Sequence, residues 1–522
     1  MVSYVSNPRV TLNIIARDAL VGLEEHRVLF VGQKTSAGSA ATGFNRETPR
    51  TAAEINALYG ARSHLACMLR AFREINPYTH VDVLALADND SGTAATGVIT
   101  FTGTATAAAT IYVSVGSAQN NRYELNIANG DTATAIGAAL TALITADTSA
   151  PFTAANSTGA VTCTAANKGT LANNYLISVL DAYDRPVAVP GITVAITGWT
   201  GGATNPTLTN LFDPVDGIRY QTVVWPEGYT LATAQTFIDA RKNVDNNIMD
   251  GTVYVFSNDT YSNVKTLSLA TNSSEIVLMT NEKVNATEWK GPHIPEICDV
   301  VAARVAASVS LRFEDGFSIS NIVSTNEPLD QFGGIHTASL PYFNTKLLNT
   351  KRPLSGTGYS FAEQLDLEKH GVTVIGYNRP NNAIILGQVV TTYQNDPAGN
   401  ADDTWKWLEW RHTHGVIREY FVLNCRKEFS QYRMSRGTAV PGYAIANEEV
   451  IRAFLYQLYD TLADLALTVK GRGFRKLFED RLVVTLDPGN RRATINADVP
   501  MVSQLGEIQG TVKFNFQPGA AA

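Results

Sequence analysis

The sequence predicts an α/β plus α+β multidomain fold, with a β-rich domain inserted into its first part and an extended arm at each end. Three observations support this prediction. Strand and helix patterns alternate on both sides of a segment that begins near residue 88, that segment itself has a different composition, and both ends of the chain alternate like strands. At 522 residues the chain is too long for one core, so several domains are expected.

The first part alternates strand, helix and strand. The run HRVLFVG (26–32) predicts a buried strand, and VDVLALA (81–87) predicts another. Between them, apolar residues at helical spacing over residues 51–77 predict one helix that ends at Pro77. This order predicts a parallel α/β unit.

The composition changes abruptly after this unit. Over residues 89–206 Ala, Thr, Gly, Ser and Asn dominate, whereas Lys, Arg and Glu nearly vanish. Short runs of β-branched and aromatic residues keep a period of two, which argues against a disordered linker. We therefore expect an inserted β-rich domain, sandwich-like or barrel-like, with one helix at 132–147.

The α/β pattern then resumes, and the strands on both sides of the insertion are expected to share one sheet. The predicted strands are 218–226, 251–257 and 275–280, and the main helices are 231–245 and 294–313. Beyond about residue 330 we expect two strands around the turn YNRPNNA, a strand and a long helix in 405–433, a helix at 447–468 opened by Asn447, and a hairpin at 482–499.

The predicted domain boundaries follow from these patterns. The domains are an N-terminal arm (1–22), an α/β core (23–88 and 207–328), the insertion (89–206), a C-terminal α+β domain (329–505) and a C-terminal arm with its tail (506–522). In the arms, Val10, Leu12 and Ile14 share one face of a strand, as do Val512, Phe514 and Phe516. Chain ends are usually frayed and polar, so such strands raise the question of what pairs with them.

Composition excludes several classes of protein. The net charge of −7 argues against wholesale coating of nucleic acid, and no run of about twenty apolar residues predicts a membrane span. The N-terminus lacks the pattern of a signal peptide, and the cysteines are scattered without CxxC spacing, at Cys67, Cys163, Cys298 and Cys425. We expect reduced thiols in a protein that is made and folded in a cytoplasm.

Candidate chemical motifs are weak. His412 and His414 would share a face of a strand, but no carboxylate or cysteine accompanies them at useful spacing for a metal. Gly32, Lys34 and Thr35 follow a strand without the spacing of a phosphate-binding loop, and G-x-S-x-G is absent. The sequence therefore predicts no catalytic residue, no cofactor and no metal.

One charged segment stands out. Residues 469–481 are expected to form a basic turn, with cations at Lys470, Arg472, Arg475, Lys476 and Arg481. A solvated face, a contact with an acidic protein surface and nucleic-acid binding are the three interpretations of this turn.

Residues 210–516 resemble the contractile tail sheath proteins of bacteriophages. The resemblance rests on the apolar helix 294–313, on NEPLDQFGGIHTASLPYF (326–343), and on HGVTVIGYNRPNNAIILGQVVTTY (370–393), in that order. It implies a tail-sheath-like core whose copies stack as a helical jacket around a tail tube and contract to drive the tube through the host envelope. It also implies that the terminal arms add strands to a sheet of neighbouring subunits.

The resemblance further implies sites and partners. The arms match Val10 to Ile15 and Gly510 to Gln517, and the hairpin with Val484 and Ile495 is the expected receiver. Tube contacts would come from Lys470, Arg472, Arg475 and Lys476. Expected partners are further copies of the chain, the tail tube protein, and baseplate and tail terminator proteins, without direct nucleic acid or membrane insertion. The protein would lie in the virion tail after assembly in the host cytoplasm.

Three alternatives remain at this point. The first is the sheath of a related phage-tail-like injection device. The second is an α/β enzyme with a β insertion, which would need a glycine-rich first turn or a nucleophile. The third is an adhesin or capsid-decoration protein, which would explain the inserted domain but neither the α/β core nor the arms.

Overall fold

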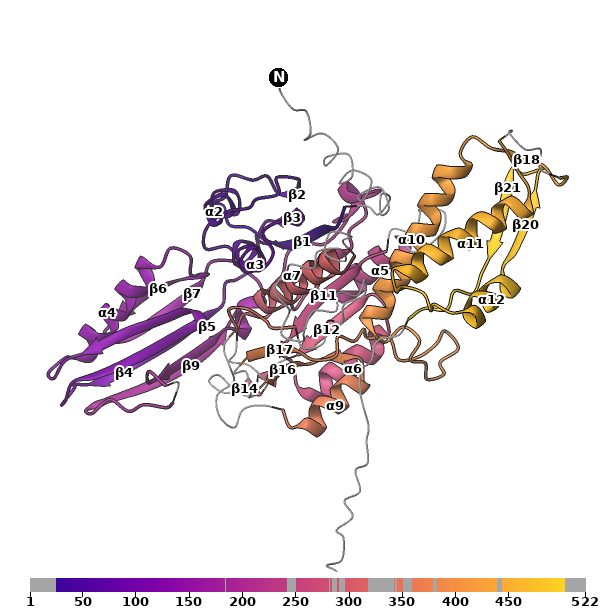
Figure 1. The fold of residues 1–522 in the computed structure, drawn as a ribbon. Coiled ribbons are helices and arrows are strands. Elements are labelled where there is room, and N and C mark those ends of the chain that lie inside the picture. Colours follow the sequence, from indigo (N-terminus) through magenta and orange to yellow (C-terminus); the bar gives the residue numbers. More distant parts are fainter. Residues whose placement is uncertain are drawn as a thin grey trace, which may run out of the picture. The chain divides into compact units, whose positions relative to one another are not determined.

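The structure is a computed structural model, and it divides into two compact units, Met1–Ser430 and Gln431–Ala522 (Figure 1). Each unit is described by itself. The described residues are 25–183, 185–241, 250–280, 282–283, 289–290, 296–317, 342, 345–350, 359–378, 383–438 and 444–502. Both predicted arms, with Val10, Leu12, Ile14, Val512, Phe514 and Phe516, lie outside these residues.

A seven-stranded sheet is the centre of the first unit. Its order is β15-β12-β11-β10-β1-β3-β2, and all neighbours are parallel except β2 and β3. The strands are β1 Arg27–Gln33, β2 Gly43–Asn45, β3 His80–Leu86, β10 Thr222–Val224, β11 Thr252–Ser257, β12 Ile276–Thr280 and β15 Val372–Thr373. The prediction that strands before and after the insertion share one sheet is confirmed.

Helices cover both faces of this sheet because successive side chains of each strand alternate between two apolar cores. In β1, Val28 and Phe30 join one core, and Leu29 and Val31 join the other. The first core contains residues of α2 (Ala52–Tyr59), α3 (His64–Arg73) and α7 (Cys298–Phe317). The second contains residues of α5 (Leu231–Arg241), α6 (Tyr261–Thr271) and α9 (Phe361–Lys369).

The single helix predicted over 51–77 is wrong, because the structure has two helices there. Gly60 ends α2 with φ +85°, a conformation that glycine adopts without strain. A capping box of Thr51 and Glu54 opens α2, and the Ser63 hydroxyl accepts from the Ala66 amide to open α3. Apolar spacing continued through the break, so periodicity alone missed it.

The segment between β3 and β10 is rich in strands (Figure 1). One sheet has the order β6-β7-β4-β9, and β5 pairs with β8. The elements are β4 Thr96–Gly103, β5 Ala109–Ile127, α4 Ala133–Ala146, β6 Phe152–Ser157, β7 Ala160–Ala165, η1 Leu171–Asn174, β8 Leu176–Leu180 and β9 Ile192–Thr200. They share an apolar core in which Trp199 meets the rings of Phe152 and Tyr175 edge-on, at 5.8 and 5.3 Å.

The remaining elements of the first unit are short except for one helix. They are η2 Asp213–Val215, β13 Glu282–Lys283, β14 Trp289–Lys290, β16 Ile375–Asn378, β17 Ala383–Leu386 and α10 Leu408–Phe429. The expectation that His412 and His414 lie on a strand is wrong, because both belong to α10. Residues two apart on a helix point about 200° apart, so the two imidazoles do not share a face.

The second unit contains two helices and a hairpin. Its elements are β18 Arg433–Met434, β19 Ile445–Ala446, α11 Glu448–Asp464, α12 Arg472–Arg481, β20 Val483–Asp487 and β21 Arg492–Asn496. Asn447 caps α11 as predicted, because its side chain accepts from the Val450 amide. The expected basic turn is wrong: residues 472–481 form α12. Glycines at 471 and 473 suggested a turn, but Gly471 only precedes the helix as its N-cap residue.

Candidate assembly interface

The hairpin β20–β21 is the part of the predicted interface that the structure describes. The strands are antiparallel, with Val484 opposite Ile495 and Leu486 opposite Ala493. Directly opposite residues lie on the same face of a sheet, so these four side chains form one face. The prediction of a hairpin within 482–499 is confirmed.

Helix α11 packs against this face at β20 but leaves β21 exposed. Val484 and Leu486 are each 2% exposed, whereas all five residues of β21 are exposed. The apolar side of α11, which includes Ile451, Leu455 and Leu458, is buried, and the helix packs against β20. β21 therefore extends beyond the helix that supports β20.

Helix α12 braces the same support. Phe478 is fully buried and stacks on Tyr459 of α11, with ring centroids 4.6 Å apart. The Tyr459 hydroxyl donates to the Val469 carbonyl at 2.9 Å, which ties the link between the helices to α11. Helices α11 and α12 thus support the hairpin through β20, whereas all five residues of β21 are exposed.

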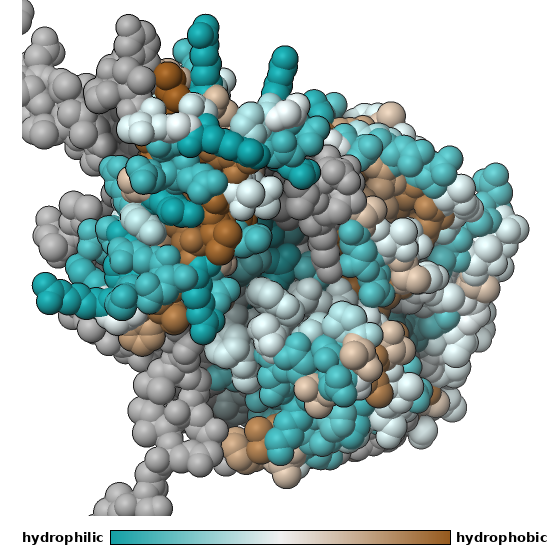
Figure 2. Space-filling model, turned by 90° about the vertical axis from the view of Figure 1, so that its right-hand side faces the viewer, coloured by the Kyte–Doolittle hydropathy of each residue, from teal (hydrophilic) through white to brown (hydrophobic). Residues whose placement is uncertain are grey.

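The outer edge of β21 has no strand beside it among the residues that the structure describes. An edge strand presents a row of backbone N–H and C=O groups that can pair with a strand from another chain. Ile495 of β21 is 39% exposed, and Val483 of β20 is 51% exposed on the opposite face, so both faces of the hairpin carry some exposed apolar surface. On the side of the molecule in Figure 2, hydrophobic residues interrupt the hydrophilic surface in separate small patches.

The predicted tube-contact residues lie on or beside α12, and most are paired with carboxylates of the same unit. Lys470 contacts Asp464 at 2.8 Å, which raises the pKa of the lysine, and Lys476 contacts Asp480 at 3.4 Å. Arg475 contacts Asp460 and Glu479, each at 2.6 Å, and Arg481 contacts Asp498 at 2.6 Å. Arg472 has no ion pair among the described contacts.

These pairs change the charge of the predicted patch. Four of the five cations face carboxylates, so the surface alternates in sign and is not uniformly basic. The sequence missed two contributors that lie within it, Phe474 at 48% and Leu477 at 36% exposure. Had the segment been predicted as a helix, Phe474 and Leu477 would have been expected on one face, because residues three apart on a helix share a face.

The described residues contain no candidate metal site. No group of three or more His, Cys, Asp or Glu side chains in that part of the chain could hold a metal ion. The four cysteines are free thiols in the structure. None of the described helices combines the length and the apolar character needed to cross a membrane.

Comparison with known proteins points to one class of structural protein. No family model matches the chain. The Mu-like prophage FluMu tail sheath protein of Haemophilus influenzae is 25% identical over 498 residues, which are 94% of this chain and 93% of that protein.

Solved structures with the same kind of name also match. A sheath tail protein from Listeria innocua has 12% identity, with 95% of this chain and 96% of that chain covered and a TM-score of 0.45. A sheath tail protein from Desulfitobacterium hafniense has 10% identity, 92% and 97% coverage and a TM-score of 0.44. Over nearly its whole length the chain is therefore a relative of a phage tail sheath protein, and the predicted resemblance to that family is confirmed.

Proposed function

We propose that this chain is the structural subunit of a phage contractile tail sheath, which polymerises as a helical jacket around the tail tube and contracts to drive the tube through the host envelope. The observation that carries the proposal is the similarity to a prophage tail sheath protein over 94% of the chain. The similarity covers more of the chain than the first unit alone, which is Met1–Ser430.

Strand exchange would link the subunits. In the proposal, the segments with Val10, Leu12 and Ile14 and with Val512, Phe514 and Phe516 leave their own subunit and pair beside β21 of neighbouring copies. Each backbone hydrogen bond gained this way contributes about 0.5–1.5 kcal/mol net, and each fully buried apolar side chain about 1.5–3 kcal/mol. The open edge of β21 and the exposed Ile495 support this receiver.

The proposed tube contact is the surface of α12. Because its cations already face carboxylates, a tube would meet alternating charges around Phe474 and Leu477, with Arg472 as the cation best placed to form a new pair. Exposed ion pairs are individually weak, which suits a contact that must release during contraction. Lys470, Arg475 and Lys476 would take part by exchanging partners.

The enzyme alternative has a specific place to be tested, the crevice at the carboxyl ends of β1 and β10. In the sheet order, β3 lies on one side of β1 and β10 on the other, which is the position where open α/β sheets bind ligands. Here the Gln33 amide donates to Asp88 and to the Lys168 carbonyl, both at 2.8 Å, and accepts from the Tyr229 hydroxyl at 2.9 Å. Asn167 donates to Asp88 at 2.9 Å. The polar side chains at this crevice thus hydrogen-bond to one another and to the segment between β3 and β10.

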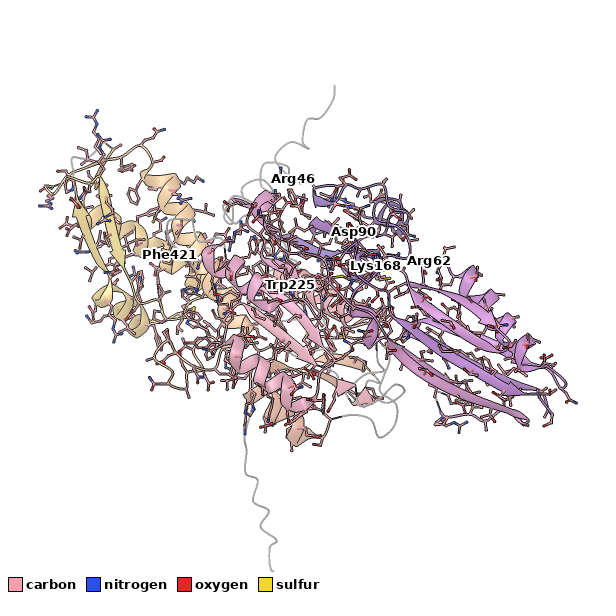
Figure 3. All side chains as sticks on the ribbon, turned by 180° about the vertical axis from the view of Figure 1, so that it is seen from behind. Arg46, Arg62, Asp90, Lys168, Trp225 and Phe421 are labelled. Carbon is pink, nitrogen blue, oxygen red and sulfur yellow. The ribbon has the colours of Figure 1, made fainter. Side chains whose placement is uncertain are left out.

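Further contacts fix the inserted strands beside this crevice. Arg62, Asp90 and Lys168, labelled in Figure 3, lie where the inserted strands meet the seven-stranded sheet. The Arg62 guanidinium donates to the carbonyls of Ala150 and Phe152, and the Lys168 amine donates to the Asp90 carbonyl. In the proposal, the inserted strands therefore move with the α/β core when the sheath contracts.

The proposed partners are further copies of the chain, the tail tube protein, and baseplate and tail terminator proteins, in a virion tail assembled in the host cytoplasm. A sheath of a related phage-tail-like injection device would use the same subunit contacts. The prophage origin of the curated relative favours the phage tail.

Electron microscopy of the purified chain tests the proposal. We expect hollow helical polymers from the full chain, and folded subunits without polymers after deletion of residues 509–522, because the deletion removes the exchanged strand. Circular dichroism of the truncated subunit controls for folding. Normal polymers from the truncated chain would contradict strand exchange, and dispersed full-length subunits under all assembly conditions would contradict the sheath.

A further inference from the structure

A buried cluster of charged residues lies where β11 begins and α10 packs against the seven-stranded sheet. Its centre is Asp250, which accepts from Arg219 and Arg418, each at 2.8 Å, and lies 3.2 Å from Arg411. Arg411 also contacts Glu275 at 2.8 Å, and Arg219 contacts Glu419. We call these six residues the Asp250 cluster: Arg219, Asp250, Glu275, Arg411, Arg418 and Glu419.

The charges of the cluster balance, with three arginines against three carboxylates. Burial by itself raises the pKa of Asp250, but the charges of Arg219, Arg411 and Arg418 outweigh it and hold that pKa well below its usual range. Asp250 is therefore ionised at neutral pH. The cluster has no negative charge left over to compensate an additional cation.

Two histidines share the cluster's cavity, which has a volume of about 30 Å³. His412 contacts the Thr252 hydroxyl through Nε2 at 3.0 Å and the Tyr342 hydroxyl through Nδ1 at 2.6 Å. His26 contacts the Thr222 hydroxyl at 3.2 Å through Nε2. The ring of Phe313 lies between the two imidazoles, 5.1 Å from His26 and 5.2 Å from His412.

Both imidazoles are uncharged at neutral pH. Burial, with smaller effects from neighbouring groups, lowers the pKa of each to about 3. His412 and Arg219 add to the lowering at His26, and Arg411 adds to it at His412, where Asp250 acts in the opposite direction. His414, on another side of α10, packs against Trp405, and burial lowers its pKa to about 4. A proton on any of these rings would place a cation beside arginines in a largely buried site.

His26 also has a particular position in the chain. It directly precedes β1, so it is the point where the N-terminal segment, residues 1–24, joins the core. Its partners come from distant parts of the sequence: Thr222 begins β10, and Phe313 belongs to α7. The contacts of this one side chain therefore hold the residue before β1 against β10 and α7.

We propose that the Asp250 cluster, with His26 and His412, is an acid-sensitive clamp that fixes the N-terminal arm to the core at neutral pH and releases its root in mild acid. The arm itself rests on the proposed function. When the contacts of His26 and His412 break, the two imidazoles become exposed and can take up protons from water. The ion pairs between the arginines and carboxylates of the Asp250 cluster remain intact.

The sign of the pH dependence follows from the pKa values of the two states. An exposed histidine has a pKa of about 6.5, whereas His26 and His412 in the closed clamp have a pKa of about 3. Below pH 6.5 the open state binds more protons, so the clamp loses stability as the pH falls from 6.5 toward 3. Above pH 6.5 neither state is protonated, and these histidines give no pH dependence.

One neighbouring group acts in the opposite direction. Burial raises the pKa of Glu409, which accepts from the Tyr342 amide at 3.1 Å, to about 7. The closed state therefore binds a proton on Glu409 that the open state releases, so acid between pH 7 and 4.5 favours closure through this group. Two histidines outweigh one glutamate, and replacing Glu409 should steepen the response to acid.

Hydrogen exchange of the full chain, measured by mass spectrometry at pH 7.5, 6.0 and 5.0 and corrected for the intrinsic rate, tests the clamp. We expect local opening in peptides that cover residues 25–33 and 406–416 to increase at least about tenfold between pH 7.5 and 5.0, because each linked histidine contributes up to tenfold per pH unit. Protection unchanged across this range would overturn the proposal.

Matched variants separate the clamp from general acid sensitivity. His26→Gln with His412→Gln keeps an amide near each Nε2 and should abolish the increase, because the remaining linked group, Glu409, favours closure in acid. His370→Gln, at a side chain 40% exposed, should leave the increase unchanged. An undiminished increase in the double variant would overturn the clamp.

Two further measurements complete the test. If the double variant does not fold, Glu409→Gln replaces it, and an acid response no steeper than that of the native chain would overturn the clamp. Polymer formation at pH 7.5 is scored separately: its absence would contradict the sheath, while a normal acid response in the same sample would retain the clamp.

Discussion

The seven-stranded sheet and the hairpin β20–β21 differ in how far their edge strands are open to pairing with another strand. In the large sheet, helices bury both faces, and its edge strands β2 and β15 have only three and two residues. In the hairpin, one strand is supported by a helix, and the five residues of β21 are all exposed. Short edges protect a sheet from further pairing, whereas an exposed edge invites it.

The comparison separates stability from assembly. Side chains of β1 and its neighbours contribute to two continuous cores, so substitutions there should act on the isolated subunit. Side chains of β21 bury little surface within the subunit, so substitutions there should change the stability of the polymer and not that of the subunit. Substitutions in each sheet test whether stability and assembly depend on different residues.

The largest effect is expected from Phe30→Ala in the large sheet. Phe30 is fully buried and meets the Phe72 ring edge-on at 5.3 Å, so truncation should lower the free energy of unfolding by about 3–5 kcal/mol. Urea denaturation followed by fluorescence measures this loss. Val483→Ala, at a side chain 51% exposed, is the control and should change stability by less than about 0.5 kcal/mol. Equal losses of unfolding free energy in the two variants would contradict the proposed difference between the two sheets.

A smaller effect is expected inside the hairpin, where two opposite residues differ in burial. Val484→Ala should lower the free energy of unfolding by about 1.5 kcal/mol, since two buried carbon groups are lost. Ile495→Ala should cost less than about 0.5 kcal/mol in the subunit but reduce the yield of pelleted polymer. A larger stability loss at Ile495 than at Val484 would show that β21 is covered within the subunit.

The smallest effect is expected on α12. Arg472→Glu with Arg475→Glu and Lys476→Glu should weaken assembly on the tube a few-fold, because exposed ion pairs contribute only about 0.2–1 kcal/mol each. Binding of subunits to purified tubes measures the change. Lys476→Glu with Asp480→Lys is the matched control, since it retains an ion pair one helical turn apart and the net charge. Unchanged tube binding by the triple variant would remove α12 as the contact.

Much of the fold could be predicted because local patterns agree with the tertiary structure. The buried strands β1 and β3, the capped start of α11 at Asn447 and the hairpin turn all follow rules that act over a few residues. The wrong predictions came from segments with two compatible patterns. His412 and His414 alternate with neighbours as in a strand, yet they lie in α10, whose buried residues include Leu408, Val416 and Ile417.

The candidate site shows the same division. The sequence identified the hairpin and the cations near α12, because turn residues and charges are visible locally. It did not reveal that β21 is exposed beyond α11, or that Arg475 is paired with Asp460 fifteen residues earlier. Burial and ion pairing depend on which elements pack together, so they require the fold.

By itself, then, the sequence determined most of the order of strands and helices, the change of composition near residue 88 and the apolar alternation at both ends of the chain, since these depend on residue type and spacing alone. Only the tertiary structure decided that Gln33, at the end of β1, donates to the Lys168 carbonyl in the segment between β3 and β10, and that Asp250 contacts three arginines from two separate segments. The physical reason is that hydrogen bonds and ion pairs act over a few ångströms in space, whatever the distance along the chain.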